Sequence, residues 1–467
     1  MLGIEQTKNV RIISSDSLPQ DDPYLTLSHR WGNPPGILLQ NDTIYLLRDD
    51  ISPYLLDSEE AAVEKTEDIM QMDNVYTNST LNIMAAEGQV HNGLVFDRDI
   101  LSVNPCRAHV SVNGVGESVT LQAFSSERYL SGGPLYERGW VFQERALAPR
   151  IVHFTKNQVY WECHELEASE VLPKGLPNRS LRRFNTALMD PNSSSKQLYE
   201  NWLAVISHYS DTSLTFGDDR LLAISALAKR YWSAMQFDPS DYSAGIWKGG
   251  LPLSLLWWQE HQDTNLYSER AATTNSITTE TQLAPSWSWA SSLGEIWYVA
   301  PGYKEATAEI VDIHIDRVSQ NFFDGTYSCR IRLRGSVCKF HRRFRDGAPW
   351  IRISENTEFR ELYDLTLVKS RCISISWDTS RRSPACFLLH IATERYHMED
   401  GPMERGIILQ RTPDCGVYTR VGSFIISDTS EYAGSELEDA FCGRLDTLDA
   451  GDYHERDSDG KYVIDII

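Results

Sequence analysis

The sequence predicts an α+β protein, with an α/β domain at the N-terminus, a helical segment after it and a β-rich C-terminal region. Apolar strand-like runs alternate with helical periodicity between residues 20 and 168. Residues 199–300 carry helical patterns and many tryptophans, whereas residues 301–467 resemble a series of short strands. A chain of 467 residues, 41% of them hydrophobic, is long enough to bury more than one core.

Charge and cysteine content narrow the possible functions. The chain has 44 Lys+Arg against 65 Asp+Glu, a net charge of -21. This balance argues against nucleic-acid binding and against electrostatic attachment to anionic membranes, because both need a basic surface. The sequence shows neither a signal peptide nor an apolar run of about 18 residues, so no membrane span is expected. Eight cysteines without a C-x-x-C pair predict a reduced, intracellular and metal-free protein. No cofactor is expected.

The predicted N-terminal domain, residues 20–168, starts with a strand in "YLTLSHRWG". Leu25 and Leu27 alternate to one side of it, and the turn residues "GNPP" end it. The segment "DSEEAAVEKTEDIMQMDNVY", residues 57–76, predicts a helix because Asp57 and Glu60 resemble a capping box and apolar residues share one face.

The rest of this domain continues the alternation. "TLNIMAA", residues 80–86, is either a strand or a buried helix, and "NGVGES", residues 113–118, is typical of a hairpin turn. "GWVFQERALAP" predicts a short helix between Gly139 and Pro149, because proline cannot continue a helix. "RIVHFTKNQVYWEC", residues 150–163, predicts two short strands around a turn.

Beyond this domain, residues 169–198 are rich in turn formers and predict a connector. Two helices are expected in the helical and Trp-rich region, residues 199–300, and strands fill residues 301–467. Within the latter, residues 428–460 are acidic and predict a solvated excursion. The final "KYVIDII" predicts a last strand that closes a sheet.

The stretch "YERGWVFQERALAPR" holds the strongest candidate site. Trp140 and Glu144 lie one turn apart on one helix face, with Arg138 just before the helix. The pattern allows three interpretations: a surface Glu beside a core Trp, a Glu in a half-dry pocket, or a buried Arg138–Glu144 ion pair. "SHRWG" ends a strand, where open α/β sheets place their ligand crevices, so both segments together favour a shared pocket.

Other candidates have simpler explanations. His153, Cys163 and His164 allow a thiol nucleophile with a His base, but a buried Cys is usually just a small apolar residue. Trp287 and Trp289 alternate as on a strand, where core packing is more probable than binding of a planar ligand.

Several motifs resemble the heterokaryon incompatibility (HET) domain of filamentous fungi. "YLTLSHRWG" resembles its opening motif, "MDNVYTNSTLNIMAA" its helix and following strand, and "RGWVFQERALAPRIVHF" its closing motif. The later "YSAGIWKGGLPLSLLWW" and "APSWSWAS" resemble the region that commonly follows. The resemblance implies a cytoplasmic protein of fungal non-self recognition and programmed cell death, with protein partners or self-association.

A weaker similarity links this domain to the Toll/interleukin-1 receptor (TIR) domain. "GWVFQE" resembles the TIR W-x-x-x-E helix, whose Glu is catalytic in members that cleave NAD, which implies that Glu144 is a catalytic carboxylate and NAD a substrate. By the same resemblance a further set of residues lines the pocket: Ser28, His29, Arg30, Trp31, Gly32, Arg138, Trp140 and Gln143.

One segment departs from the family. HET domains carry a strand and loop of the form W-I-D-x-x-C-I-x-Q, but here "ISPYLL" runs almost directly into "DSEEAAVEKTEDIMQM". The strand that would flank the first strand and form part of the crevice wall is therefore missing. Three hypotheses follow: an NAD-cleaving enzyme, an interaction module without chemistry, and a degenerate copy that keeps only the fold.

Overall fold

The computed structural model describes most of the second half of the chain and several segments of the first. The described residues are 19, 22–30, 37–39, 61–63, 72–87, 94, 106–112, 114–121, 133–156, 158–176, 190, 192–259, 284–292, 294–298, 304–317, 327–345, 348–352, 360–361, 373–377, 385–395, 402–427 and 448–467. The chain divides into two compact units, residues 1–190 and 191–467. The stretch predicted as a connector spans this division, and the predicted helical and β-rich regions both belong to the second unit.

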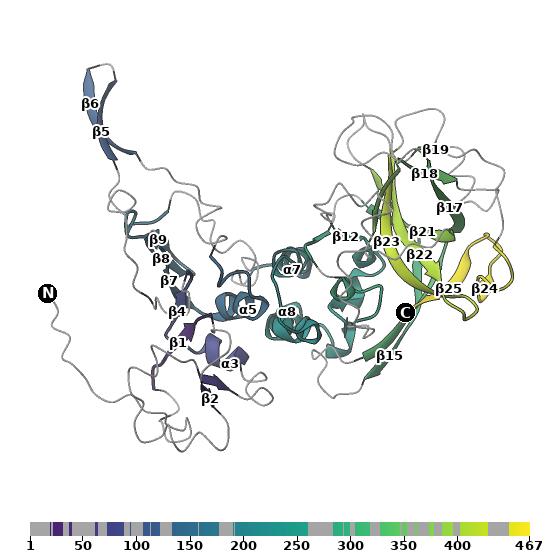
Figure 1. Ribbon diagram of the computed structural model, residues 1–467, viewed down its shortest axis with the longest axis horizontal. Helices are drawn as coiled ribbons and strands as arrows, with labels where there is room; N and C mark the ends of the chain where they lie inside the picture. The colour runs from purple at the N-terminus through teal and green to yellow at the C-terminus, as the bar shows by residue number, and fades with distance from the viewer. Residues whose placement is uncertain are drawn as a thin grey trace. The chain divides into compact units, whose positions relative to one another are not determined.

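A five-stranded sheet forms the centre of the first unit (Figure 1). Its first three strands are parallel and its last two antiparallel. In spatial order they are β1 (Leu25–Ser28), β4 (Leu81–Ala85), β7 (Arg150–Phe154), β8 (Val159–Cys163) and β9 (Glu167–Ser169). The predicted strands at both ends of the domain are confirmed, and "TLNIMAA" forms a strand rather than a helix.

Two helices connect the parallel strands. The helix α3 (Met72–Thr77) lies between β1 and β4 in the chain, and α5 (Gly139–Leu147) between β4 and β7. Because both crossovers step across the sheet in the same direction, their right-handedness puts both helices on one face. The core under α5 contains apolar residues from the sheet, from the helix and from the turn before it: Met84, Leu135, Val141, Ala148 and Ile151.

The other face of β1 is open. Leu25 and Leu27 are 58% and 56% exposed, whereas Thr26 and Ser28 are buried. The alternation predicted for this strand is present, but its leucines point away from the helices. Within the described part of the chain, β1 pairs only with β4 and forms the edge of the sheet. A right-handed crossover to a strand on the outer side of β1 would place a helix on this face, and no such strand lies among the described residues.

The helix predicted at residues 57–76 is only partly correct. Ala61–Val63 form strand β3, which pairs in parallel with β2 (Ile37–Leu39), and the helix begins at Met72. Backbone pairing with a distant segment outweighs the helical pattern here, as tertiary contacts often do. The predicted capping residues Asp57 and Glu60 lie outside the described residues. The predicted hairpin turn is confirmed between β5 (Cys106–Val112) and β6 (Val115–Leu121), with Gly114 at φ +80.

The second unit begins with two helices and a group of short elements around buried tryptophans. The helix α7 (Ser195–Ser210) includes the last four residues of the predicted connector, because Ser194 and Gln197 form a capping box at its start. The remaining elements before the large sheet are η4 (Gly217–Asp219), η5 (Leu222–Ile224), α8 (Ser225–Met235), η6 (Pro239–Asp241), β10 (Tyr242–Ser243), β11 (Ile246–Trp247), η7 (Lys248–Gly250), η8 (Leu253–Leu255), β12 (Trp257–Gln259), η11 (Trp289–Ser291) and β13 (Ile296–Tyr298).

The prediction that Trp287 and Trp289 alternate on a strand is wrong. Trp287 lies in a turn and Trp289 begins η11, where the Ser288 side chain caps the next turn. Both indoles are fully buried, as are those of Trp202, Trp247 and Trp257, so core packing accounts for them. Trp202 meets Tyr231 and Trp247 at ring distances of 5.3 and 6.2 Å.

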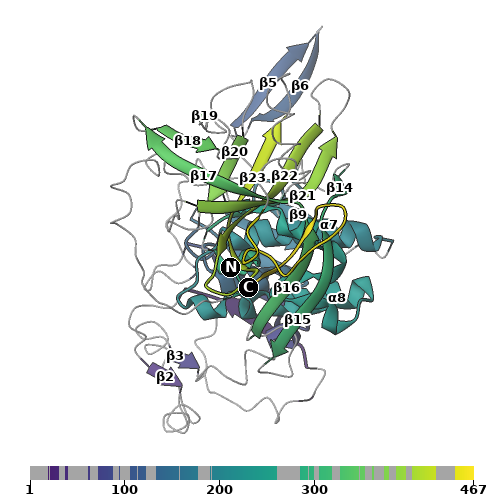
Figure 2. The ribbon, with the colours of Figure 1, turned by 90° about the vertical axis from the view of Figure 1, so that its right-hand side faces the viewer.

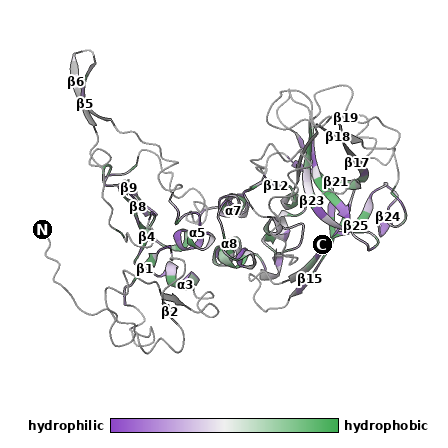
Figure 3. Ribbon diagram, viewed as in Figure 1, coloured by the Kyte–Doolittle hydropathy of each residue, from purple (hydrophilic) through white to green (hydrophobic). Residues whose placement is uncertain are grey.

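The C-terminal part of this unit is one large sheet whose long strands β21, β22 and β23 lie side by side (Figures 1 and 2). Hydrophobic and hydrophilic residues are mixed along these strands (Figure 3). The path of the sheet is β15 (Glu309–Arg317), β16 (Tyr327–Gly335), β25 (Tyr462–Ile466), β23 (Val417–Ser427), β22 (Pro402–Arg411), β21 (Ala385–Arg395), β17 (Val337–Arg345), β18 (Ala348–Arg352) and β19 (Arg360–Glu361). Off this path, β14 (Lys304–Ala306), β20 (Ile373–Trp377) and β24 (Glu455–Arg456) pair with β21, β23 and β25. The predicted last strand is confirmed.

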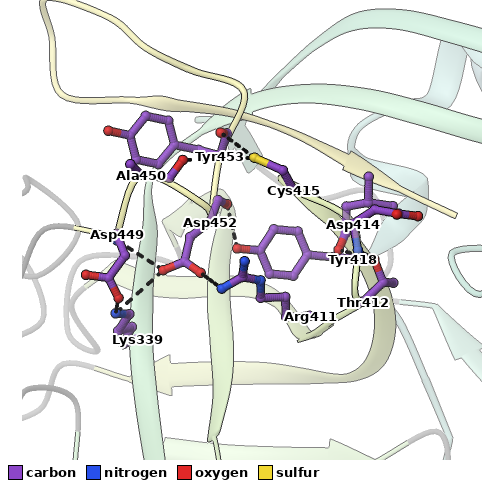
Figure 4. Close-up of polar contacts among 11 residues, drawn as sticks. Lys339, Arg411, Thr412, Asp414, Cys415, Tyr418, Asp449, Ala450, Asp452 and Tyr453 are labelled. Atoms are coloured by element: carbon purple, nitrogen blue, oxygen red, sulfur yellow. Dashed lines mark hydrogen bonds and ion pairs between the residues drawn. The ribbon is translucent and has the colours of Figure 1, made fainter.

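At the described end of the acidic segment, residues 448–460, most side chains are exposed or half-exposed, but Asp452 is buried. Asp452 is 1% exposed, and its carboxylate accepts a hydrogen bond from Arg411 at 2.7 Å and lies 3.5 Å from the Lys339 amine (Figure 4). Tyr418 donates to the Asp452 carbonyl at 2.6 Å. Asp452 departs from the predicted solvated segment because two cations of the sheet, Arg411 and Lys339, neutralise its buried carboxylate. Residues 428–447 lie outside the described part of the chain.

No helix in the described part of the chain is long and apolar enough to cross a membrane.

Candidate functional site

The candidate site centres on Glu144, in the second turn of α5. The helix starts at Gly139 and ends at Leu147, where the Ala148 amide donates to the Glu144 carbonyl and Pro149 prevents continuation, as the sequence predicted. Glu144 is 9% exposed and faces the sheet. One of its carboxylate oxygens, Oε2, is buried and has no hydrogen-bond partner among the described residues. An unsatisfied buried carboxylate oxygen is costly and needs an explanation.

Two hydroxyl groups from other elements reach this carboxylate. Ser28, at the end of β1, and Tyr76, in α3, each donate a hydrogen bond to Glu144. Burial raises the pKa of Glu144, and the two hydrogen bonds together with the nearby Arg138 cation act in the opposite direction. Burial and the Glu144 charge also raise the pKa of Tyr76, so its hydroxyl stays protonated and remains a donor.

Asn82, in β4, fixes the direction of the Ser28 hydroxyl. Thr26 donates to Asn82 Oδ1 at 3.1 Å, which orients the amide so that Nδ2 donates to Ser28 Oγ at 3.1 Å. Ser28 Oγ also lies 3.3 Å from Asn82 Oδ1, but its single proton goes to the stronger acceptor, the Glu144 carboxylate. Asn82 is fully buried. A polar chain therefore runs from Thr26 through Asn82 and Ser28 to Glu144.

Arg138 precedes α5 and connects it to the end of β1. Its Nη1 donates to the His29 carbonyl at 3.0 Å. Burial and the Arg138 charge lower the pKa of His29, which favours a neutral imidazole. No ion pair joins Arg138 to Glu144 among the described residues, so the predicted alternative of a buried Arg138–Glu144 pair is not what holds the helix.

The other predicted site residues differ in how deeply they are buried. Gln143 is buried beside Glu144 in the sequence, and Trp140, one turn earlier, is half-buried. Arg30 is exposed at the end of the described β1 segment. Trp31 and Gly32 lie outside the described residues. The structure thus brings Ser28, His29, Arg138 and Glu144 together at the end of β1.

The thiol–histidine pair considered at His153 and Cys163 is not formed. His153 contacts Tyr136 and Glu162, whereas the Cys163 sulfur accepts a hydrogen bond from the Leu166 amide at 3.3 Å. In the β7–β8 register His153 faces Tyr160 and Cys163 faces Arg150, three positions away.

Sequence reasoning missed the roles of Asn82 and Tyr76. Asn82 is the only amide in the apolar run "LNIMA". Because a buried amide needs hydrogen-bond partners, its position in this run could have indicated a buried polar network. Tyr76 is the last residue of the segment in which the sequence predicts a helix with one apolar face, and only the packing of α3 beside α5 brings its hydroxyl to Glu144.

Comparison with known proteins supports the resemblance seen in the sequence. Residues 56–144 match the family described as heterokaryon incompatibility protein (HET). The match covers Tyr76 and Asn82 and ends at Glu144. No curated protein and no solved structure matches the chain. Over these residues, the match confirms the resemblance to the HET domain that the sequence motifs indicated.

Proposed function

We propose that this protein acts in fungal non-self recognition and triggers programmed cell death in the cytoplasm by hydrolysing NAD through Glu144. One observation carries the enzymatic part of this proposal. The Glu144 carboxylate is held by hydroxyls from two other elements while its Oε2 stays buried without a partner among the described residues. Such an oxygen is ready to accept a hydrogen bond from a ligand.

The chemistry fits a single carboxylate. In NAD hydrolysis the bond between the ribose C1′ and the nicotinamide nitrogen breaks, and its electron pair leaves with nicotinamide. Water adds to C1′ and loses a proton, which gives ADP-ribose. Positive charge builds on the ribose in the transition state, as in glycoside hydrolysis. The ionised Glu144 would stabilise that charge, or hold a ribose hydroxyl, in surroundings of low dielectric.

The cation beside the site suits the rest of the substrate. Arg138 lies at the end of β1, and a guanidinium binds pyrophosphate oxygens well. Arg138 also lowers the pKa of Glu144, which opposes the effect of burial and favours the ionised form that the reaction needs.

A second candidate function, an interaction or self-association module without chemistry, is favoured by a different observation. β1 pairs only with β4 in the described part of the sheet, and Leu25 and Leu27 are exposed. A crevice beside β1 would lack the wall that a flanking strand supplies. A degenerate copy of the domain would show the same open edge.

NAD loss by the purified full-length protein tests the proposal. We expect turnover in the wild type and a loss of at least about 100-fold in Glu144→Gln, since removing one group that stabilises transition-state charge costs about that much. Glu137→Gln is the matched control, because this exposed carboxylate lies just before the same helix. A folded wild type that leaves NAD intact would refute the enzymatic proposal and leave the interaction module.

A further inference from the structure

A closed ring of four side chains lies beneath α5, on the side of the helix away from β1. Tyr136 Oη lies 2.6 Å from His153 Nδ1, and His153 Nε2 lies 2.9 Å from Glu162 Oε2. Arg145 Nε donates to the same oxygen at 3.0 Å, and Arg145 Nη2 forms an ion pair with it at 3.0 Å. The Arg145 guanidinium closes the ring by lying 5.4 Å from the centre of the Tyr136 ring.

The hydrogen-bond chemistry defines one arrangement of protons. Glu162 is fully buried and receives the Arg145 cation, so it is the acceptor for His153 Nε2–H. The other ring nitrogen, Nδ1, then carries the lone pair and accepts the Tyr136 hydroxyl. Burial, with the Glu162 charge as a smaller contribution, raises the pKa of Tyr136, and this keeps the hydroxyl protonated as the donor.

The ring ties α5 to the sheet at two points. Tyr136 precedes the helix and Arg145 lies in its second turn, while His153 and Glu162 belong to the neighbouring strands β7 and β8. The N-terminus of α5 has no side-chain cap and no acidic residue in its first turn. Local capping interactions therefore do not stabilise the start of this helix. Two anchors about nine residues apart fix both the position and the rotation of a helix of this length.

Rotation of α5 decides where Glu144 points. Arg145 is the next residue in the chain, and successive helical residues are about 100° apart around the axis. The contact of Arg145 with β8 therefore determines the direction of Glu144 towards Ser28 and Tyr76. We propose that Tyr136, His153, Glu162 and Arg145 are positioning residues that hold the Glu144 carboxylate in its buried, hydroxyl-bound geometry. Their role in turnover rests on the proposed function, but their effect on Glu144 itself does not.

The test measures the Glu144 carboxyl group directly in the full-length protein. Its protonation is followed against pH by infrared spectroscopy, and the Glu144→Gln spectrum identifies its band. Two variants open the ring: Tyr136→Phe removes one hydroxyl, and Arg145→Met removes the cation with little change in length. Tyr209→Phe is the matched control, because its buried hydroxyl donates to the Arg220 carbonyl at 2.7 Å in the other compact unit.

We expect both ring variants to move the Glu144 pKa down towards its ordinary value, because a displaced carboxyl gains water. Tyr209→Phe should leave that pKa where it is in the wild type. If the wild type cleaves NAD, both ring variants should lower kcat about tenfold to a hundredfold and change KM little, as misplacement of a catalytic group does.

The outcomes separate this proposal from the proposed function. An unchanged Glu144 pKa in folded Tyr136→Phe and Arg145→Met would overturn the positioning role, whatever the activity. A wild type without turnover would refute NAD hydrolysis, yet a Glu144 pKa that moves in the ring variants alone would still establish the positioning role.

Discussion

At the scale of single residues, the effect of pH on Glu144 separates a functional carboxylate from a structural one. Its pKa is raised in the folded protein by burial, so the folded state binds a proton more tightly than the unfolded state. Stability from this group is then greatest at low pH and is lost as pH rises from the unfolded value through the folded one. A structural ion pair would depress the pKa and have the opposite sign.

We therefore expect Glu144→Gln to be more stable than the wild type at neutral pH, because the amide avoids the cost of burying a charge. The amide oxygen can still accept the hydrogen bonds of Ser28 and Tyr76. The gain should shrink as pH falls below the folded pKa, where the wild-type carboxyl is protonated too. Urea unfolding at pH 5 and pH 7.5 measures this, with Glu137→Gln as the control. A variant that is less stable at pH 7.5 by about 3–5 kcal/mol would instead indicate a buried ion pair.

At the scale of elements, β1 alternates polar and apolar side chains as a strand should, but it buries the polar ones. Thr26 and Ser28 point into the helix-covered face, where Asn82 binds both of their hydroxyls. Leu25 and Leu27 lie on the face that lacks a helix in the described part of the chain. Parallel sheets usually have both faces covered, so an exposed apolar face on a parallel edge strand is unusual.

This difference between the two faces predicts unequal costs of truncation. Ile151→Ala should lower the free energy of unfolding by about 2–5 kcal/mol, because Ile151 is fully buried under α5. Leu27→Ala should lower it by less than about 1 kcal/mol, because more than half of that side chain already meets solvent. Equal costs in urea unfolding would show that the β1 face is covered in solution.

At the scale of the whole molecule, Arg420 joins the helical and β-rich parts of the second unit through buried contacts. This buried residue of β23 donates to the Leu255 and Trp257 carbonyls at 2.8 and 2.6 Å, and its guanidinium lies 3.3 Å from the centre of the Trp257 ring. The Ser286 hydroxyl adds a second connection, since it accepts from the Arg420 amide at 2.8 Å and donates to the carbonyl of the last residue, Ile467. The tryptophan cluster and the large sheet therefore share one core.

Calorimetry of the full-length protein should resolve two transitions, one for each compact unit. Arg420→Met should lower the stability of the second unit by about 3–5 kcal/mol, because it leaves two buried carbonyls unpaired, and should leave the first transition in place. Arg456→Ala is the control, as this exposed arginine only approaches the Tyr462 ring at 5.2 Å. A shift of both transitions by Arg420→Met would show that the units unfold together.

The sequence by itself determined most of the regular structure in the described part of the first unit. The helix from Gly139, the strands on either side of the Lys156 turn and the hairpin at Gly114 all follow from local periodicity and turn chemistry. Its motifs also indicated the resemblance to the HET domain that the match over residues 56–144 confirms. These features depend on residues close together in the chain, so a local pattern is enough to specify them.

Only the tertiary structure decided what surrounds Glu144. Ser28, Tyr76 and Asn82 come from three different elements, and none of them adjoins α5 in the sequence. The strand at Ala61–Val63, where the sequence favours a helix, likewise depends on pairing with Ile37–Leu39. The sequence likewise could not predict which side of β1 is buried. Alternation shows which residues share a face, but not which face a helix will cover. That choice follows from the direction of the crossovers, which is a long-range property of the chain.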